Sequence, residues 1–229
     1  MEWDEEGRGY IVQRRQAAGA QLEHSAEVGR RLDEYMGGMH GVIGWFDLQA
    51  LLVLRVLSAH QITTGVKGGV VEIGVHHGKS LAALCLLNQD GGGGARLFSI
   101  DGSHTAAATL HDLRLAAGTV GEGGVVMVDD YFAEGWPGVS EGVQTFLREQ
   151  DASSDLELIP FFVGFNKVLL APREHASGYM ETLLEARDVV GDQTMRVKMS
   201  VMAEHPVVIF TEEVRCRKNV RGLSAPLNP

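Results

Sequence analysis

The sequence predicts an α/β fold with a mostly parallel sheet flanked by helices and an antiparallel hairpin toward the C-terminal end. Between residues 70 and 150, short apolar runs bounded by glycines alternate with helical patterns, which is typical of a buried parallel sheet. Residues 156–172 then form two apolar runs joined through Gly164 to Asn166, the pattern of a hairpin. A content of 45% hydrophobic and 22% charged residues fits a globular domain.

The N-terminal part is predicted to be helical. Sparse apolar positions among charges predict a surface helix over 11–36, which the glycines of 37–41 end. A more buried helix is expected over 47–60, with Asp47 as its N-cap. We therefore expect an N-terminal helical arm (1–40), an α/β domain (41–212) and a flexible basic tail (213–229).

The elements of the α/β domain follow from the same patterns. Strands are expected over 70–74, 96–101, 123–130 and 206–210, besides the hairpin. Helices are expected directly after Gly78 and over 104–118, 138–150 and 173–190. A glycine-rich loop, 88–95, separates the first of these helices from the second strand.

Composition limits the partners and the compartment. A formal net charge of −10 argues against nucleic acid, and the longest apolar run is too short for a membrane span and contains Arg55. The cysteines, Cys85 and Cys216, are too few for a disulfide framework or a zinc cluster, and Cys85 is predicted to be buried. The acidic N-terminus is unlike a signal peptide, so we expect a cytoplasmic protein.

The stretch VVEIGVHHGKS, residues 70–80, carries the first candidate site. Its Gly-Lys-Ser ending suggests a phosphate-binding loop, but only three residues separate Gly74 from Gly78 where that motif has four. Alternatively, Glu72, Gly74, Gly78 and Ser80 form a strand-end turn that lets a nucleoside-bearing ligand approach the backbone. The simpler interpretation is an ordinary strand–helix turn.

Carboxylates follow the next two predicted strands. Asp101 ends one strand, with His104 three residues later, and Asp129 and Asp130 end the next. Because parallel strands end at the same edge of a sheet, these side chains should converge, and close carboxylates favour a cation between them. The alternative is that each aspartate caps the following helix.

These residues lie in motifs that resemble a known family. IDGSH (100–104), GGVVMVDDY (123–131) and WPGV (136–139), together with the turn at Gly74, resemble the metal-dependent macrocin O-methyltransferase-like group of class I S-adenosylmethionine-dependent methyltransferases. The resemblance covers about residues 41–171 and implies a Rossmann-like sheet. It implies methyl transfer to a hydroxyl of a sugar or other small metabolite. It also implies that His104 is the general base and that Mg²⁺ or a similar cation binds Asp101, Asp129 and Asp130. S-adenosylmethionine would bind along Glu72, Gly74, Gly78 and Ser80.

The chain departs from that family in one respect. Family members carry a further strand–helix–strand unit, which supplies the acid for the donor's ribose, where this chain has only the loop 88–95. Asp101 or Asp90 could replace that acid. The shortening also leaves the strand order open, because joining the first two strands directly with the helix on its usual face gives a rare left-handed crossover. A non-catalytic binding or assembly module therefore stays as an alternative function, and a homo-oligomer is left open.

Overall fold

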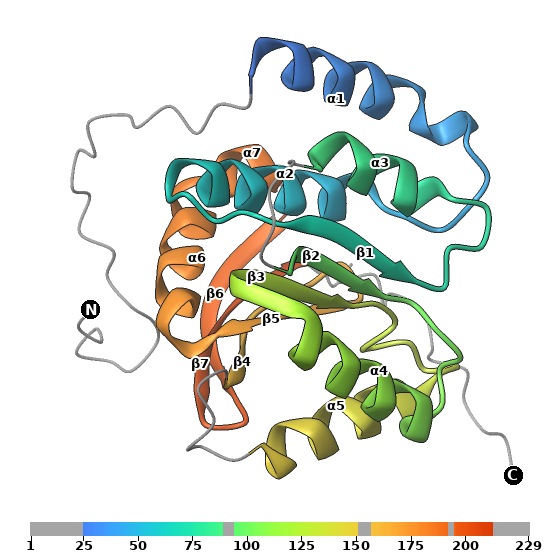
Figure 1. Cartoon of the computed structure of the whole chain (residues 1–229), viewed down its shortest axis with the longest axis vertical. Coiled ribbons are helices and arrows are strands. Elements are labelled where there is room, and N and C mark those ends of the chain that lie inside the picture. The colour runs from blue at the N-terminus through green and yellow to red at the C-terminus, as the bar shows by residue number, and fades with distance from the viewer. Residues whose placement is uncertain (1–24, 89–93, 151–156, 192–194, 213–229) are drawn as a thin grey trace, which may run out of the picture.

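The computed structural model describes residues 25–88, 94–150, 157–191 and 195–212, and within them one mixed sheet lies between two helical layers (Figure 1). The helices are α1 (Ala26–Gly38), the 3-10 turn η1 (Met39–Gly41), α2 (Leu48–Thr63), α3 (Lys79–Leu87), α4 (Ala106–Thr119), α5 (Pro137–Glu149), α6 (Arg173–Glu185) and α7 (Arg187–Val190). The strands are β1 (Gly69–Ile73), β2 (Ala95–Ile100), β3 (Val120–Val128), β4 (Leu158–Gly164), β5 (Lys167–Pro172), β6 (Met195–Met202) and β7 (His205–Glu212).

The strand order is β1-β2-β3-β5-β4-β7-β6. Strands β1, β2 and β3 are parallel, as predicted, and β4–β5 forms the expected antiparallel hairpin. The remaining pairs are mixed: β3–β5 and β6–β7 are antiparallel and β4–β7 is parallel. The α/β class is thus confirmed, with the parallel part confined mainly to the first strands.

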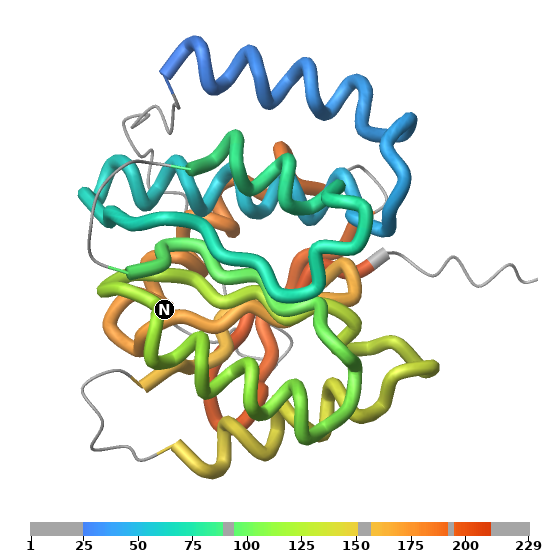
Figure 2. The backbone as a smooth tube through the Cα atoms, turned by 45° about the vertical axis from the view of Figure 1, so that its right-hand side comes forward, coloured from blue at the N-terminus to red at the C-terminus, as the bar shows by residue number. Residues whose placement is uncertain are grey.

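Two apolar clusters hold the layers together. The first lies between the sheet and the layer of α2, α3 and α6, and the second lies under α4 and α5. Alternate residues of β3 serve the two clusters: Val125 and Met127 belong to the first, Val126 and Val128 to the second. Helix α1 forms an outer layer over α3 (Figure 2) and buries Leu32 completely.

Several sequence-based expectations need correction or fall outside the described residues. Cys85 is exposed rather than buried, because only one side of α3, with Ala83, Leu84 and Leu87, faces the core. Strand β6 was not predicted, since its residues alternate between exposed and half-buried without a strong apolar run. The N-terminal part of the predicted helix 11–36, Asp90, Cys216 and the tail 213–229 lie outside the described residues. In the described ranges no helix is long and apolar enough to cross a bilayer.

The structure settles the order of the first three strands, which the sequence left open. Strand β2 lies between β1 and β3, so both connections step in the same direction across the sheet. Their helices lie on opposite faces, α3 with the first apolar cluster and α4 with the second (Figure 1). The two crossovers therefore have opposite hands, and one of them is left-handed, against the usual rule. This arrangement keeps the ends of β2 and β3 side by side.

The ends of β1 and β2 approach so closely that only glycine fits between them. A Cβ on Gly74 would lie 1.7 Å from the backbone oxygen of Asp101, and Gly74 has a φ of +85°. The Asp101 amide donates to the Ile73 carbonyl at 2.9 Å, which continues the ladder to this point. Gly74 thus allows the carboxyl ends of the two strands to meet.

Replacing Gly74 with alanine should destabilise the protein by roughly 3 kcal/mol or more, because the new Cβ would overlap a backbone atom that cannot move without parting β1 from β2. Gly78→Ala is the matched control: its φ is +81°, but a Cβ there meets nothing within 4 Å. Only backbone strain of about 1–2 kcal/mol is then expected. Urea unfolding followed by circular dichroism measures both, and equal losses would contradict the close approach.

Candidate functional site

The candidate site lies at the carboxyl ends of the parallel strands. Ile73, Ile100 and Val128 are in register across β1, β2 and β3, and the Asp129 amide donates to the Ile100 carbonyl at 2.9 Å. The next residues along each strand are therefore neighbours. The convergence of Asp101 and Asp129 predicted from the sequence is confirmed by this register.

An Asp–His–Asp cluster forms the centre of the site. His104 Nε2 lies 3.2 Å from Asp101 Oδ1 and 3.2 Å from Asp130 Oδ2. One ligand atom from each of the three residues lies within 4.8 Å of the others. Burial and the nearby charge of Asp129 raise the pKa of Asp101. The hydrogen bond to His104 acts in the opposite direction. The cluster is therefore short of positive charge.

The backbone around the cluster is held in an uncommon conformation. His104 has a φ of +60° and Asp130 a φ of +57°, a region that costs a non-glycine residue about 1–3 kcal/mol and is found often at functional sites. The His104 ring also stacks on Trp136, with ring centroids 4.7 Å apart. These constraints fix the imidazole beside the two carboxylates.

Asp129 is engaged differently from Asp130. Its Oδ1 accepts a hydrogen bond from Lys167 Nζ at 2.6 Å and another from the Asp130 amide at 2.8 Å. The Lys167 side chain is only 3% exposed, and its ammonium lies 5.7 Å from the centre of the Phe46 ring. A buried lysine thus neutralises one of the two adjacent aspartates.

Asn166 holds the other aspartate. Its Nδ2 donates to Asp130 Oδ1 at 2.7 Å, and its Oδ1 accepts from the Phe132 amide at 3.0 Å. Its backbone carbonyl accepts from the Tyr131 amide, also at 3.0 Å. Asn166, in the turn between β4 and β5, is therefore hydrogen-bonded to each residue from Asp130 to Phe132.

Glu72 lies on β1, one residue before the end of the strand. Both carboxylate oxygens are buried, and neither has a hydrogen-bond partner in the described part of the chain. Burial is the main cause that raises the pKa of Glu72, and the charge of Asp101 adds to it, while the nearby Ser80 and Ser99 hydroxyls oppose it. A carboxylate held in this way lowers the stability of the fold, as is common at functional sites.

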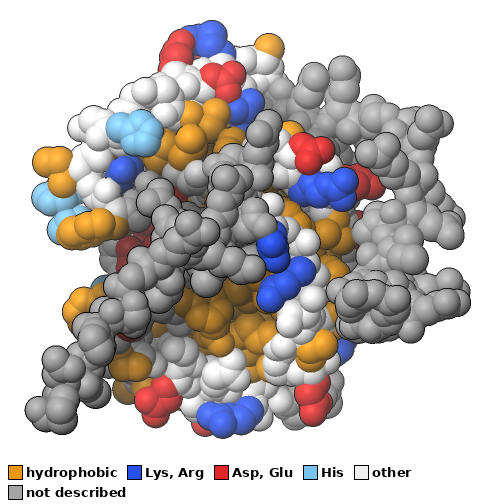
Figure 3. Space-filling model, turned by 180° about the vertical axis from the view of Figure 1, so that it is seen from behind, with side chains coloured by type: hydrophobic (Ala, Val, Ile, Leu, Met, Phe, Trp, Pro, Cys, Tyr) orange, Lys and Arg blue, Asp and Glu red, His pale blue; other side chains and the backbone are white. Residues whose placement is uncertain are grey.

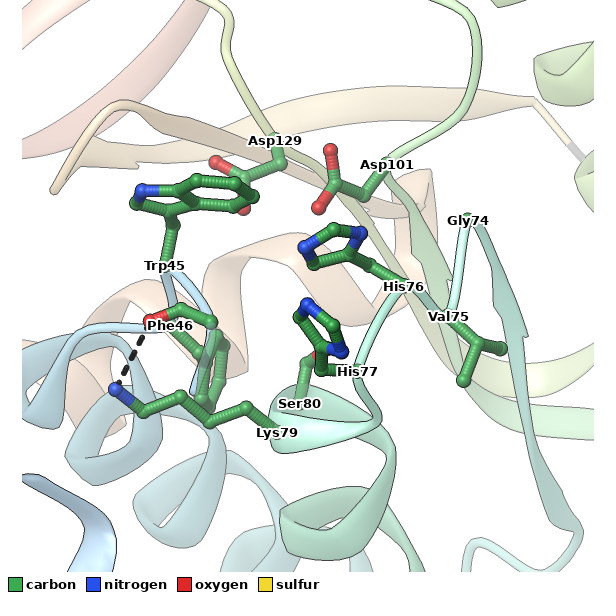
Figure 4. Close-up of a pocket in the computed structure, with 11 residues that line it drawn as sticks. Trp45, Phe46, Gly74, Val75, His76, His77, Lys79, Ser80, Asp101 and Asp129 are labelled. Atoms are coloured by element: carbon green, nitrogen blue, oxygen red, sulfur yellow. Dashed lines mark hydrogen bonds between the residues drawn. The ribbon is translucent and has the colours of Figure 1, made fainter. Parts of the chain in front are cut away.

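A pocket lies next to the cluster, beside the turn after β1. It is lined by Gly44, Trp45, Phe46, Gly74, Val75, His76, His77, Lys79, Ser80, Asp101 and Asp129. Figure 4 shows Asp101 and Asp129 pointing toward the rings of Trp45 and His76, which stack with centroids 4.9 Å apart. The cavity volume is about 30 Å³, enough for roughly two water molecules.

The phosphate-loop interpretation has no support in this pocket. Lys79 Nζ donates to the Gly44 carbonyl at 3.1 Å (Figure 4), so it does not reach over the turn as a phosphate-binding lysine would. The Tyr35 hydroxyl donates to the Lys79 carbonyl at 2.5 Å, which ties the start of α3 to α1.

One face of the molecule shows how acidic side chains are distributed away from the strand ends. On the rear face, shown in Figure 3, acidic side chains are scattered around the rim rather than gathered in one patch. The described part of the chain shows one group able to hold a metal ion, the cluster of Asp101, His104 and Asp130.

The structure brings most of the predicted site residues together. Asp101 and Asp130 adjoin the general-base candidate His104, and Asp129 lies beside Asp130. Gly74 and Ser80 line the pocket with Asp101 and Asp129, whereas Glu72 and Gly78 are not among its lining residues. The sequence interpretation missed the roles of Asn166, which it placed only in the hairpin turn, and of Lys167. A lysine inside the apolar hairpin was the available signal, because lysine is seldom buried without a partner.

Comparison with known proteins adds no identification. A scan against protein-family models finds no match, and a search of curated proteins finds none either. The function proposed below therefore rests on the residues of the site and on the motif resemblance.

Glu72→Gln should raise the free energy of unfolding at pH 7 by about 1 kcal/mol, since it removes a buried, poorly paired charge. A raised pKa means that the folded protein binds this proton more readily than the unfolded chain, so the wild type gains stability as pH falls. The advantage of the variant should shrink as pH falls from 7 through the folded pKa toward the ordinary glutamate value of 4.5. Urea unfolding at several pH values measures it, and a difference independent of pH would contradict this role.

Proposed function

We propose that the protein is an S-adenosylmethionine-dependent O-methyltransferase that uses a divalent cation and acts on a hydroxyl of a sugar or other small metabolite. The observation that carries the proposal is the cluster of Asp101, His104 and Asp130 at the carboxyl ends of parallel strands, the edge where open α/β sheets bind ligands. The motif resemblance supplies the reaction.

The cluster fits a divalent cation. Ligand atoms on opposite sides of such an ion are about twice a bond length apart, roughly 4–5 Å, and the cluster's ligand atoms all lie within 4.8 Å of one another. The carboxylate oxygens of Asp101 and Asp130 suit Mg²⁺ or Mn²⁺, and the imidazole of His104 is left free of the ion to act as a base. When bound, the cation lowers the pKa of a hydroxyl that contacts it.

The chain's own residues orient the acceptor and take its proton. Asp101 and Asp130 would hold the cation, and His104, whose Nε2 lies 3.2 Å from an oxygen of each, would accept the acceptor's proton. Trp136 keeps the imidazole in place by stacking on it. Much of the rate enhancement would come from holding the two reactants in line.

The donor would lie in the pocket beside Gly74. S-adenosylmethionine, when bound, supplies the methyl group and carries positive charge, which the Asp101 and Asp129 carboxylates lining the pocket favour. The cavity as it stands is too small for the donor. Donor binding therefore requires Trp45 and His76 to separate, and Trp45 is 83% exposed and so has few contacts to lose.

Asp130→Asn should weaken Mn²⁺ binding about 10-fold or more, because it removes one charged ligand. His104→Ala should lower turnover by about 10²–10⁴-fold while Mn²⁺ still binds. Calorimetric titration with Mn²⁺ and a methyl-transfer assay measure the two effects. Activity indifferent to both substitutions and to a chelator would refute the mechanism.

A second candidate, a non-catalytic binding or assembly module, is favoured by the small cavity and by the missing strand–helix–strand unit. Thermal unfolding separates the two functions. The methyltransferase should be stabilised by S-adenosylmethionine and by Mn²⁺ separately, because each binds only the folded state, and the fluorescence of Trp45 should change with the donor. No response to either ligand favours the module, and Trp45→Phe is the control for the fluorescence assignment.

A further inference from the structure

We propose that the turn between β4 and β5 and the first residue of β5 together position the cation site: Asn166 in the turn presents Asp130 to the cation, and Lys167 on β5 holds Asp129 away from it. The proposal rests on the proposed cation site and deepens it. It assigns different roles to Asp129 and Asp130, which the sequence alone does not distinguish. The turn itself contributes no cation ligand.

Asn166 fixes Asp130 through both ends of its amide. The amide nitrogen donates to Asp130 Oδ1 at 2.7 Å, which leaves Oδ2 directed at His104 Nε2, 3.2 Å away. The amide oxygen accepts from the Phe132 amide at 3.0 Å, so the carboxylate and the backbone that carries it are held by one side chain. Such hydrogen bonds orient a cation ligand and are important for affinity.

The strained backbone of Asp130 is explained by the same contacts. A φ of +57° is unfavourable for aspartate, and the bonds from Asn166 to the segment 130–132 stabilise it. Asn166 has a φ of +61° itself, which asparagine tolerates better than most residues. The turn is thus shaped to reach the end of β3.

Lys167 sets the role of Asp129. Its buried ammonium lies 2.6 Å from Asp129 Oδ1, and the Asp130 amide donates to the same oxygen. A carboxylate paired with a fixed cation attracts a divalent ion less, because the two positive charges would repel each other. Lys167 therefore acts as an internal counter-ion, and the divalent cation is left to Asp101 and Asp130.

The two halves of the proposal predict opposite effects on cation binding. Asn166→Gly keeps the positive φ of the turn but removes the amide, so Mn²⁺ affinity should fall about 10–100-fold. Lys167→Met keeps most of the length of the side chain but removes its charge, so Asp129 becomes available and Mn²⁺ should bind more tightly than in the wild type. General damage to the fold would weaken binding in both variants.

Calorimetric titration of the full chain with Mn²⁺ measures these affinities without any assay of methyl transfer. Glu204→Gly is the control for the first variant, because Glu204 lies in the β6–β7 turn with a φ of +67° and should leave Mn²⁺ affinity unchanged. If Lys167→Met does not fold, the pair Lys167→Met with Asp129→Asn removes both charges together. That double variant should bind Mn²⁺ as well as the wild type.

The outcomes separate this proposal from the proposed function. Unchanged affinity in Asn166→Gly, or weaker binding in a folded Lys167→Met, would overturn the positioning role. A wild type that binds no Mn²⁺ would overturn both the positioning role and the cation site. Mn²⁺ binding that responds as predicted, in a protein that transfers no methyl group, would support the positioning role and overturn the methyltransferase alone.

Discussion

The balance of charge at the ends of β1, β2 and β3 is the constraint on which the site depends. Glu72, Asp101, Asp129 and Asp130 gather there, and burial already raises the pKa of the first two. The fixed cation Lys167 neutralises Asp129 alone, and His104 is shared between the other two aspartates. The remaining imbalance is what makes a divalent cation, or a cationic ligand in the neighbouring pocket, a chemically suitable addition.

Local patterns were sufficient for the class of fold. The glycine-bounded apolar runs at 70–74, 96–101 and 123–130 predicted the parallel strands because buried strands need continuous apolar sequence. Strand β6 carries Arg196 and Lys198 between its apolar residues and lies at the edge of the sheet, so it gave no such signal. The strand order depends on which face of the sheet α3 packs against. Packing with distant residues decides that face, and the sequence of the crossover alone does not.

The site was predictable to the extent that strand ends determine it. The acids Asp101, Asp129 and Asp130 could be placed together because parallel strands end at one edge. Their separate roles could not, because they come from Asn166 and Lys167, which are more than 30 residues away in the chain and reach β3 only through the β3–β5 pairing. The stacking of Trp45 on His76 likewise joins two loops whose separation in sequence gives no indication of contact.

The position of β1 at the end of the sheet has a consequence for the behaviour of the protein in concentrated solution. Among the described strands β1 pairs only with β2, and such a flank can recruit a strand from another molecule. Glu72 is the one charged residue of β1, and its oxygens are buried, so the strand itself carries little protection. The net charge of −10 adds a general repulsion between molecules, and added salt would weaken that repulsion.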